Sequence, residues 1–146
     1  MTAAIRYFAL GFGVFYTLIG TLGFIPALVS LPPVAAPSLT IATGYGYLFG
    51  LFPVNLLHNL VHLGIGALGI AAFNDTDKSR LYSQSLAIAF GVLALLGAFP
   101  TLNTLFGLVP LFGNDIWLHG LTAIVGAFFG FIAPNLERAN IAENRR

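Results

Sequence analysis

Four long apolar segments constrain this sequence more than any other feature, and Arg6 is the only charged residue within them. The segments are Ile5 to Leu28, Leu51 to Phe73, Leu81 to Pro100 and Ile116 to Ala133. A helix needs about 20 mainly apolar residues to cross the roughly 30 Å hydrocarbon core of a bilayer. The sequence therefore predicts an all-α integral membrane protein, a bundle of four transmembrane helices that forms one domain over residues 1–146.

Composition supports the membrane assignment and excludes several functions. Hydrophobic residues make up 58% of the chain and charged residues only 8%, whereas a soluble domain carries about 25% charged residues. The chain has no cysteine, which excludes disulfides, thiolate catalysis and Cys-ligated metal centres. A net charge of +1 without a basic block gives no support for a nucleic-acid partner. Membrane lipids are the predicted surroundings.

The six basic residues predict an orientation. They lie at the start of the first segment, between the second and third, and after the fourth, at Arg6, Lys78, Arg80, Arg138, Arg145 and Arg146. Because cytoplasmic loops are enriched in Lys and Arg, we expect both termini in the cytoplasm and the two longer connections on the opposite face.

Short repeated motifs favour two tandem helical hairpins. "LGFIP" at residues 22–26 resembles "LGAFP" at 96–100, and "LHNLVHLGIGALG" at 57–69 resembles "LHGLTAIVGAFFG" at 118–130. Such similarity indicates a repeat related by an axis along the membrane normal, although leucine and glycine are common in any span. Gly126 and Gly130 form a small-residue pair typical of helix contacts, either within the bundle or in a homo-oligomer.

Polar residues interrupt the second apolar segment in the stretch "FPVNLLHNLVHLGIG", residues 52–66. Asn55, His58, Asn59 and His62 follow the i, i+3, i+4, i+7 rule, so they are predicted to share one helix face. Ionisable groups in a span usually face the bundle interior or a wet cavity. His119 lies near the start of the fourth segment, on the same side of the membrane, a few residues after Asp115, which we expect to cap that helix. The three histidines are therefore predicted to converge.

Three interpretations of this polar face stay open. The histidines can be axial ligands of a tetrapyrrole such as haem or chlorophyll. They can instead bind a transition metal, with Asn55, Asn59 or Asp115 as the partner that such histidines usually have. The third interpretation is a hydrogen-bond network between helices. No catalytic residues are predicted, because the chain shows no H-E-x-x-H general base and no carboxylate in mid-membrane.

The quoted motifs resemble a bacterial family of small four-helix membrane proteins catalogued as domain of unknown function 4383. The resemblance rests on "FPVNLLHNLVHLGIGALGI" at residues 52–70, the basic turn after it, and "DIWLHGLTAIVG" at residues 115–126. It implies a plasma membrane or thylakoid membrane location and no established activity. It also implies signature positions that have no assigned role, namely Asn55, His58, Asn59, His62 and His119.

The expected function is that of a small non-enzymatic membrane protein, a structural or accessory subunit of a larger membrane complex. In this view the histidines hold a haem or chlorophyll, and Asn55 and Asn59 belong to the same cofactor site. The alternative is a membrane redox or transition-metal-binding protein that uses His58, His62 and His119.

Overall fold

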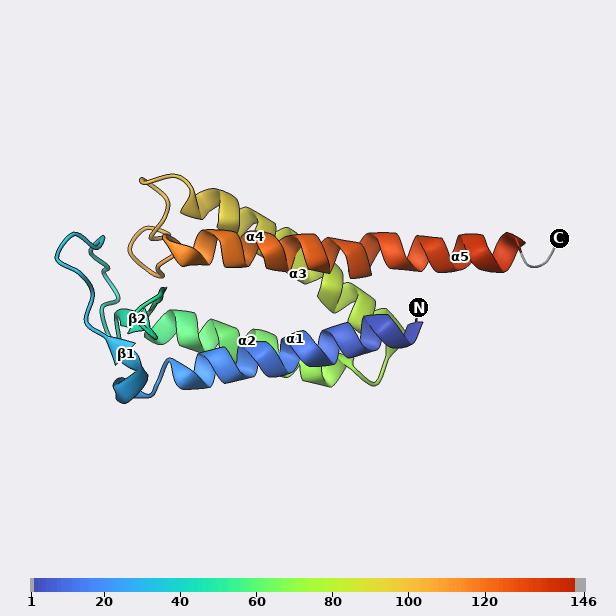
Figure 1. Ribbon diagram of the computed structural model, residues 1–146, viewed down its shortest axis with the longest axis horizontal. Coiled ribbons are helices and arrows are strands. Elements are labelled where there is room, and N and C mark those ends of the chain that lie inside the picture. The colour runs from blue at the N-terminus through green and yellow to red at the C-terminus, as the bar shows by residue number, and fades with distance from the viewer. Residues whose placement is uncertain (1, 144–146) are drawn as a thin grey trace.

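The computed structural model describes residues 2–143, except for the side chains of residues 137–141, and it is mostly helical (Figure 1). The helices are α1 Thr2–Leu22, α2 Leu56–Ala72, α3 Thr76–Gly97, α4 Asn114–Ala127 and α5 Ala133–Glu143. A π-helical turn, η2 Phe128–Ile132, joins α4 to α5 in one continuous rod. Within the described residues, three of the four rods are long and apolar enough to cross a membrane, and α2 is a shorter apolar helix. This is the pattern of a multi-pass membrane protein.

The first two helices are shorter than the apolar segments that predicted them. α1 ends at Leu22 rather than Leu28, and the chain continues through a turn of 3-10 helix, η1 Pro26–Leu28. α2 begins at Leu56 rather than Leu51, because residues 52–54 form a strand and the Asn55 side chain caps the helix. Apolar composition alone does not show these ends, since a proline or a cap can stop a helix inside an apolar stretch.

The last two helices begin earlier than predicted. α3 starts at Thr76 instead of residue 81, because the Asp75 side chain accepts a hydrogen bond from the Lys78 N–H at 3.0 Å and so supports a polar first turn. The fourth rod runs from Asn114 to Glu143, beyond the expected end at residue 133. Its N-cap is Gly113, with a φ of 64°. The prediction that Asp115 caps this helix was wrong, because Asp115 lies buried in the first turn.

A small antiparallel sheet precedes α2 and corrects the all-α expectation. Its strands are β1 Val29–Ser30, β2 Gly46–Leu48 and β3 Phe52–Val54, in the order β1-β2-β3. The tight turn between β2 and β3 places Phe49 and Gly50 at positive φ, 55° and 71°. Figure 1 shows the sheet beyond the end of α2, at the opposite end of the molecule from the N-terminus.

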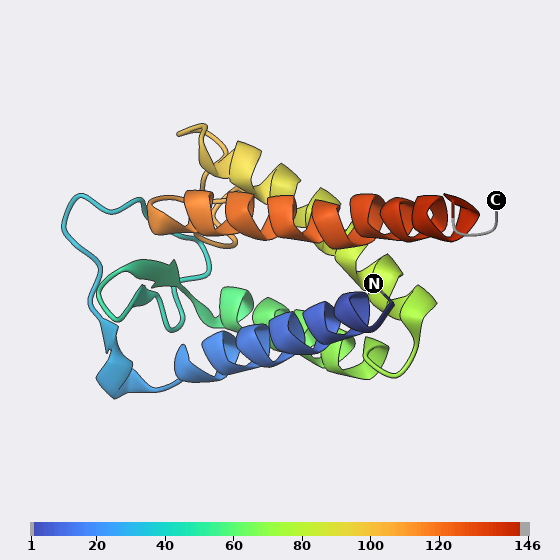
Figure 2. The same cartoon turned by 45° about the vertical axis from the view of Figure 1, so that its right-hand side comes forward.

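The helices associate in two pairs, α1 with α2 and α3 with α4, and α3 also crosses α1 (Figures 1 and 2). Glycines permit close backbone approach within each pair: a Cβ at Gly13 would lie 2.6 Å from the Ile70 nitrogen, and one at Gly126 would lie 2.9 Å from the Ser83 oxygen. Gly130 likewise faces Gln84 of α3. The predicted small-residue contact of Gly126 and Gly130 therefore lies within the molecule.

One polar contact joins the two helix pairs, and another lies within the second pair. The Tyr16 hydroxyl of α1 forms a buried hydrogen bond of 2.7 Å with Thr122 Oγ1 of α4. Pro134, four residues after Gly130, has no N–H to donate to the Gly130 carbonyl, and Arg80 Nε and Gln84 Nε2 of α3 both donate to it at 3.1 Å. Since backbone groups in an apolar medium need partners, these bonds tie α3 to the turn.

Candidate metal centre

Local helix geometry brings His58 and His62 together on α2. The Asn55 side chain accepts a hydrogen bond from the His58 N–H at 2.9 Å and fixes where the helix starts. Residues four apart on a helix lie above one another, so the two imidazoles meet face to edge, with their Nε2 atoms 3.1 Å apart. The rings lie one turn apart on the interior face.

His119 of α4 completes a cluster of three histidines. Its ring centroid lies 6.4 Å from that of His58, and one ligating nitrogen from each of His58, His62 and His119 lies within 4.8 Å of the others. All three side chains are buried. The predicted convergence of the three histidines is confirmed, although they reside on helices of different pairs.

Several polar atoms of this cluster are buried without a hydrogen-bond partner among the described residues. They are the Nδ1 atoms of the three histidines and Oδ2 of Asp115. An unmet buried donor or acceptor typically costs about 1–3 kcal/mol. The only hydrogen bond of the three imidazoles in the described part of the chain joins His58 to His62 on one helix. The geometry therefore gives little support to a network of histidine bonds between helices.

Asp115 lies behind His58. Its Oδ2 is 3.7 Å from His58 Nδ1, beyond hydrogen-bond length but only by a few tenths of an ångström. A histidine that binds a metal through one nitrogen usually donates its other N–H to a carboxylate, a carbonyl or water. Asp115 is placed to orient His58 in this way, with Nε2 turned toward the other imidazoles.

Aromatic rings from the remaining two helices hold the imidazoles in place. The Tyr16 ring of α1 lies 5.1 Å from the His62 ring, and the Phe90 ring of α3 lies 5.1 Å edge-on to His119. Neither ring was predicted from the sequence to belong to the site. The hydroxyl of Tyr16 inside an apolar span is a weak indication of an interior position. Phe90 is one of 14 phenylalanines, and nothing in the sequence distinguishes it from the others.

Two cavities adjoin the cluster. One, of about 170 Å³, is lined by all three histidines and otherwise by apolar side chains, including Leu105 and Val109 of the connection between α3 and α4. The other, of about 280 Å³, reaches His58, His62 and Asp115 from the side of α1 and the sheet. The cluster thus has space for a further ligand beside it.

The two predicted asparagines lie outside the histidine cluster. Asn55 Nδ2 donates to the carbonyls of Ile41 and Leu108 at 2.9 and 2.7 Å, so it joins the two long connections at this end of the molecule. The connection that carries Leu108 also covers the smaller cavity. Asn59 faces Gly23 near the end of α1 instead. The structure therefore brings together the three histidines and Asp115, while Asn55 supports the loops around them.

Comparison with known protein families gives a match. The model of a family described as "Domain of unknown function (DUF4383)" matches residues 6–132, which include the whole cluster. No curated protein and no solved structure matches the chain.

Proposed function

We propose that this chain, which belongs to the DUF4383 family, is a membrane protein that binds a transition-metal ion through His58, His62 and His119. The observation that carries the proposal is the convergence of three buried imidazoles whose ligating nitrogens lie within 4.8 Å of one another. Within the described residues these imidazoles make only one hydrogen bond, between the Nε2 atoms of His58 and His62, so the ligating nitrogens can turn to an ion without breaking bonds to other helices.

The spacing of the nitrogens suits a small ion. With metal–nitrogen bonds of about 2.0–2.1 Å, two ligands of a tetrahedral ion are about 3.4 Å apart. The His58 and His62 Nε2 atoms are 3.1 Å apart, and the full set stays within 4.8 Å. Small rotations of the rings would close the set around one ion. Imidazole ligands suit zinc, copper, iron and nickel, so we propose one of these divalent ions.

The neighbouring carboxyl group supports the same assignment. The carboxyl group of Asp115 lies beside the cluster. A charged group inside the membrane needs a partner of opposite charge or a hydrogen-bond partner. As a carboxylate it would offset part of the positive charge of the ion and orient His58. Three protein ligands leave a fourth coordination position, as in zinc sites that take water or a substrate. The apolar cavity of about 170 Å³ is where a small neutral molecule would reach that position.

A tetrapyrrole fits the cluster less well. Its four ring nitrogens occupy the plane around the metal, so protein ligands can enter only from the two opposite axial directions. His58 and His62 project from one helix face with their Nε2 atoms 3.1 Å apart, so they would not bind on opposite sides of one ring. A haem or chlorophyll would therefore leave at least one buried histidine without a partner.

The membrane placement is also part of the proposal. We propose two tandem hairpins, α1–α2 and α3–α4, with both termini on the cytoplasmic side of a bacterial plasma or thylakoid membrane. The pairwise packing supports the hairpins, and the basic residues Lys78 and Arg80 near the start of α3 support the orientation. The metal centre would then lie in the half of the bundle nearer the outer face.

Metal content of the purified protein tests the proposal. The full chain is purified in mild detergent with a tag that contains no histidine, loaded with zinc or copper, dialysed and measured by mass spectrometry. We expect about one ion per chain, falling at least tenfold in His119→Ala and His62→Ala. Leu121→Ala is the matched control, because it truncates an exposed side chain of α4 and leaves all three histidines in place, so it should retain the ion. A metal-free wild type, or equal content in the histidine variants, would overturn the proposal.

A further inference from the structure

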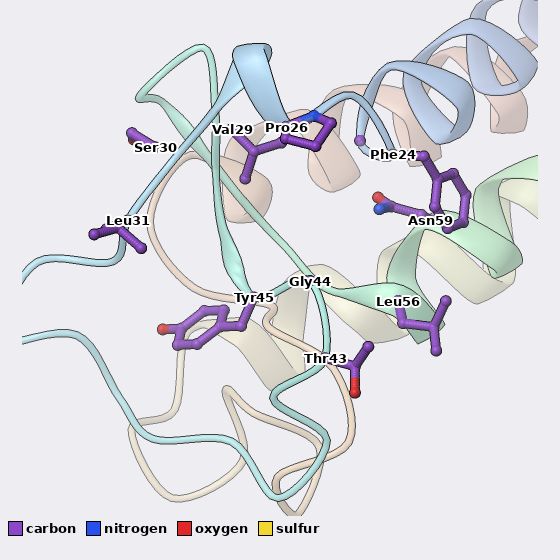
Figure 3. A pocket seen from close by; sticks show the side chains of 11 residues that line it. Phe24, Pro26, Val29, Ser30, Leu31, Thr43, Gly44, Tyr45, Leu56 and Asn59 are labelled. Carbon is purple, nitrogen blue, oxygen red and sulfur yellow. The ribbon is translucent and has the colours of Figure 1, made fainter.

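A third pocket, separate from the two cavities beside the histidine cluster, lies where the end of α1, the η1–β1 segment and residues 43–45 meet the first turn of α2 (Figure 3). Its volume is about 270 Å³. None of the described residues that line it is a histidine or carries a charge. They are Gly23, Phe24, Pro26, Val29, Ser30, Leu31, Thr43, Gly44, Tyr45, Leu56 and Asn59.

The polar group of this pocket is the side-chain amide of Asn59. The residue is only 1% exposed, and its Oδ1 has no hydrogen-bond partner in the described chain. Figure 3 shows the amide beside Phe24, directed into the pocket. Gly23 leaves room for it, because a Cβ at that position would collide with the Asn59 amide. The chain thus positions a buried amide without giving it a partner of its own.

An unmet amide in an apolar environment is costly, and leucine has nearly the same shape without that cost. If Asn59 contributed only packing, an apolar residue would serve better at this position. The amide is useful when a second molecule supplies the missing hydrogen bond. Because no charged side chain lines the pocket in residues 2–143, that molecule must be neutral.

We infer that this pocket binds a neutral, largely apolar molecule with a hydroxyl group, of the phenol or alcohol class. A hydroxyl can donate to Asn59 Oδ1 and can also accept from the amide N–H. Phe24, Pro26 and Leu56 supply apolar walls for the rest of the ligand. A cavity of about 150 Å³ suffices for benzene, so a pocket of about 270 Å³ accommodates a substituted ring.

Two fluorinated probes of similar size test this inference. 4-Fluorophenol carries the hydroxyl, whereas 4-fluoroanisole has the same ring without a donor. Binding of each to the full chain in detergent is measured by ¹⁹F NMR, with protein-free detergent as the reference for partitioning. We expect saturable binding of 4-fluorophenol and at least fivefold weaker binding of 4-fluoroanisole, the effect of one lost hydrogen bond.

Three variants separate the site from general effects. Asn59→Leu should weaken 4-fluorophenol binding five- to tenfold while the melting temperature stays equal or rises. Thr43→Phe, which fills the pocket and keeps Asn59, should abolish binding. Asn74→Leu makes the same chemical change at an exposed amide in the turn between α2 and α3 and should leave binding unchanged.

The inference does not depend on the metal centre, because the metal content of each variant is measured separately. Equal binding of both probes, or no saturable binding of 4-fluorophenol, would overturn it. An Asn59→Leu protein that melts at a lower temperature and still binds the phenol would also overturn it, because Asn59 would then be a structural residue.

Discussion

At the scale of single residues, four buried ionisable groups meet in a mainly apolar helical protein. His58, His62, His119 and Asp115 come from two helices of different pairs, and each is at most 5% exposed. Polar groups inside a membrane protein are rare and usually functional, because an unsatisfied group in an apolar environment is unfavourable. An ion between the imidazoles would satisfy the ligating nitrogens and draw the His58 N–H toward Asp115.

Asp115 provides a test that leaves all three proposed ligands in place. Asp115→Asn removes the negative charge behind His58 with little change in shape. We expect metal affinity to fall about 10- to 100-fold, as is typical for loss of the partner of a metal-binding histidine. Competition with a chelator of known affinity measures the change. Asp77→Asn, at an exposed acid in the first turn of α3, is the control and should bind as wild type does. Equal affinity for Asp115→Asn would show that Asp115 does not support His58.

Helical periodicity explains why the sequence predicts the histidine cluster but not all of its neighbours. His58 and His62 are four residues apart and both lie within α2 even though the helix begins later than predicted. Their shared face was therefore predictable. Asn55 has the right spacing for the same face, yet it is a cap residue whose side chain bonds to Ile41 and Leu108. That role depends on two distant loops, which no local pattern reveals.

At the scale of helices, close glycine contacts set the position of His119 relative to α3. A Cβ at Gly126 would lie 2.9 Å from the Ser83 oxygen and 3.0 Å from the Ala87 nitrogen, both of them backbone atoms. Because backbone cannot rotate away as a side chain can, α3 and α4 would have to separate. The cost of such overpacking is about 1–3 kcal/mol.

Paired glycine variants test this packing. We expect Gly126→Ala to lower the thermal midpoint by several degrees and to weaken metal binding, because His119 lies on the displaced helix. Gly120→Ala changes the same helix at a position where an added Cβ has nothing within 4 Å, so stability should stay the same or rise slightly. Thermal unfolding in detergent measures both. If the two variants melted at the same temperature, close packing at Gly126 would not matter for stability.

The elements themselves were only partly predictable. Long apolar stretches identify all four helical rods, but strands of two or three residues are too short to show an alternating pattern. β3 lies at the start of an apolar stretch that is predicted to be helical throughout. Only Pro53 and Asn55 indicate that the helix begins after the strand. α3 begins at Thr76 because the Asp75 side chain caps it. The prediction placed the start later because the residues of the first turn are polar.

At the scale of the whole molecule, both ends of the described chain lie toward the same end of the helices, as the two views in Figures 1 and 2 show. The turn between α2 and α3 lies at that end too, and the sheet and the long connections lie at the other. This arrangement is compatible with four passes and the orientation we propose.

Cysteine labelling tests the orientation in a chain that has no native cysteine. Val34→Cys places a single thiol at an exposed position in the connection before α2, and Lys78→Cys places one at an exposed position in the first turn of α3. Because the basic connection should face the cytoplasm, we expect a membrane-impermeant maleimide to label Val34→Cys on intact cells. Lys78→Cys should react only after permeabilisation. The reverse pattern would invert the orientation and place the metal centre nearer the cytoplasm.

All four helical rods contribute to the histidine cluster, with the proposed ligands on α2 and α4 and packing rings from α1 and α3. The coordination of the ion therefore reports on the assembled molecule. X-ray absorption at the K-edge of the bound metal measures it most directly, in the full chain purified with a tag free of histidine. We predict three imidazole nitrogens at about 2.0–2.1 Å if the ion is zinc, with loss of one imidazole in His119→Ala. A shell of oxygen ligands, or one unchanged in His119→Ala, would contradict a three-histidine centre.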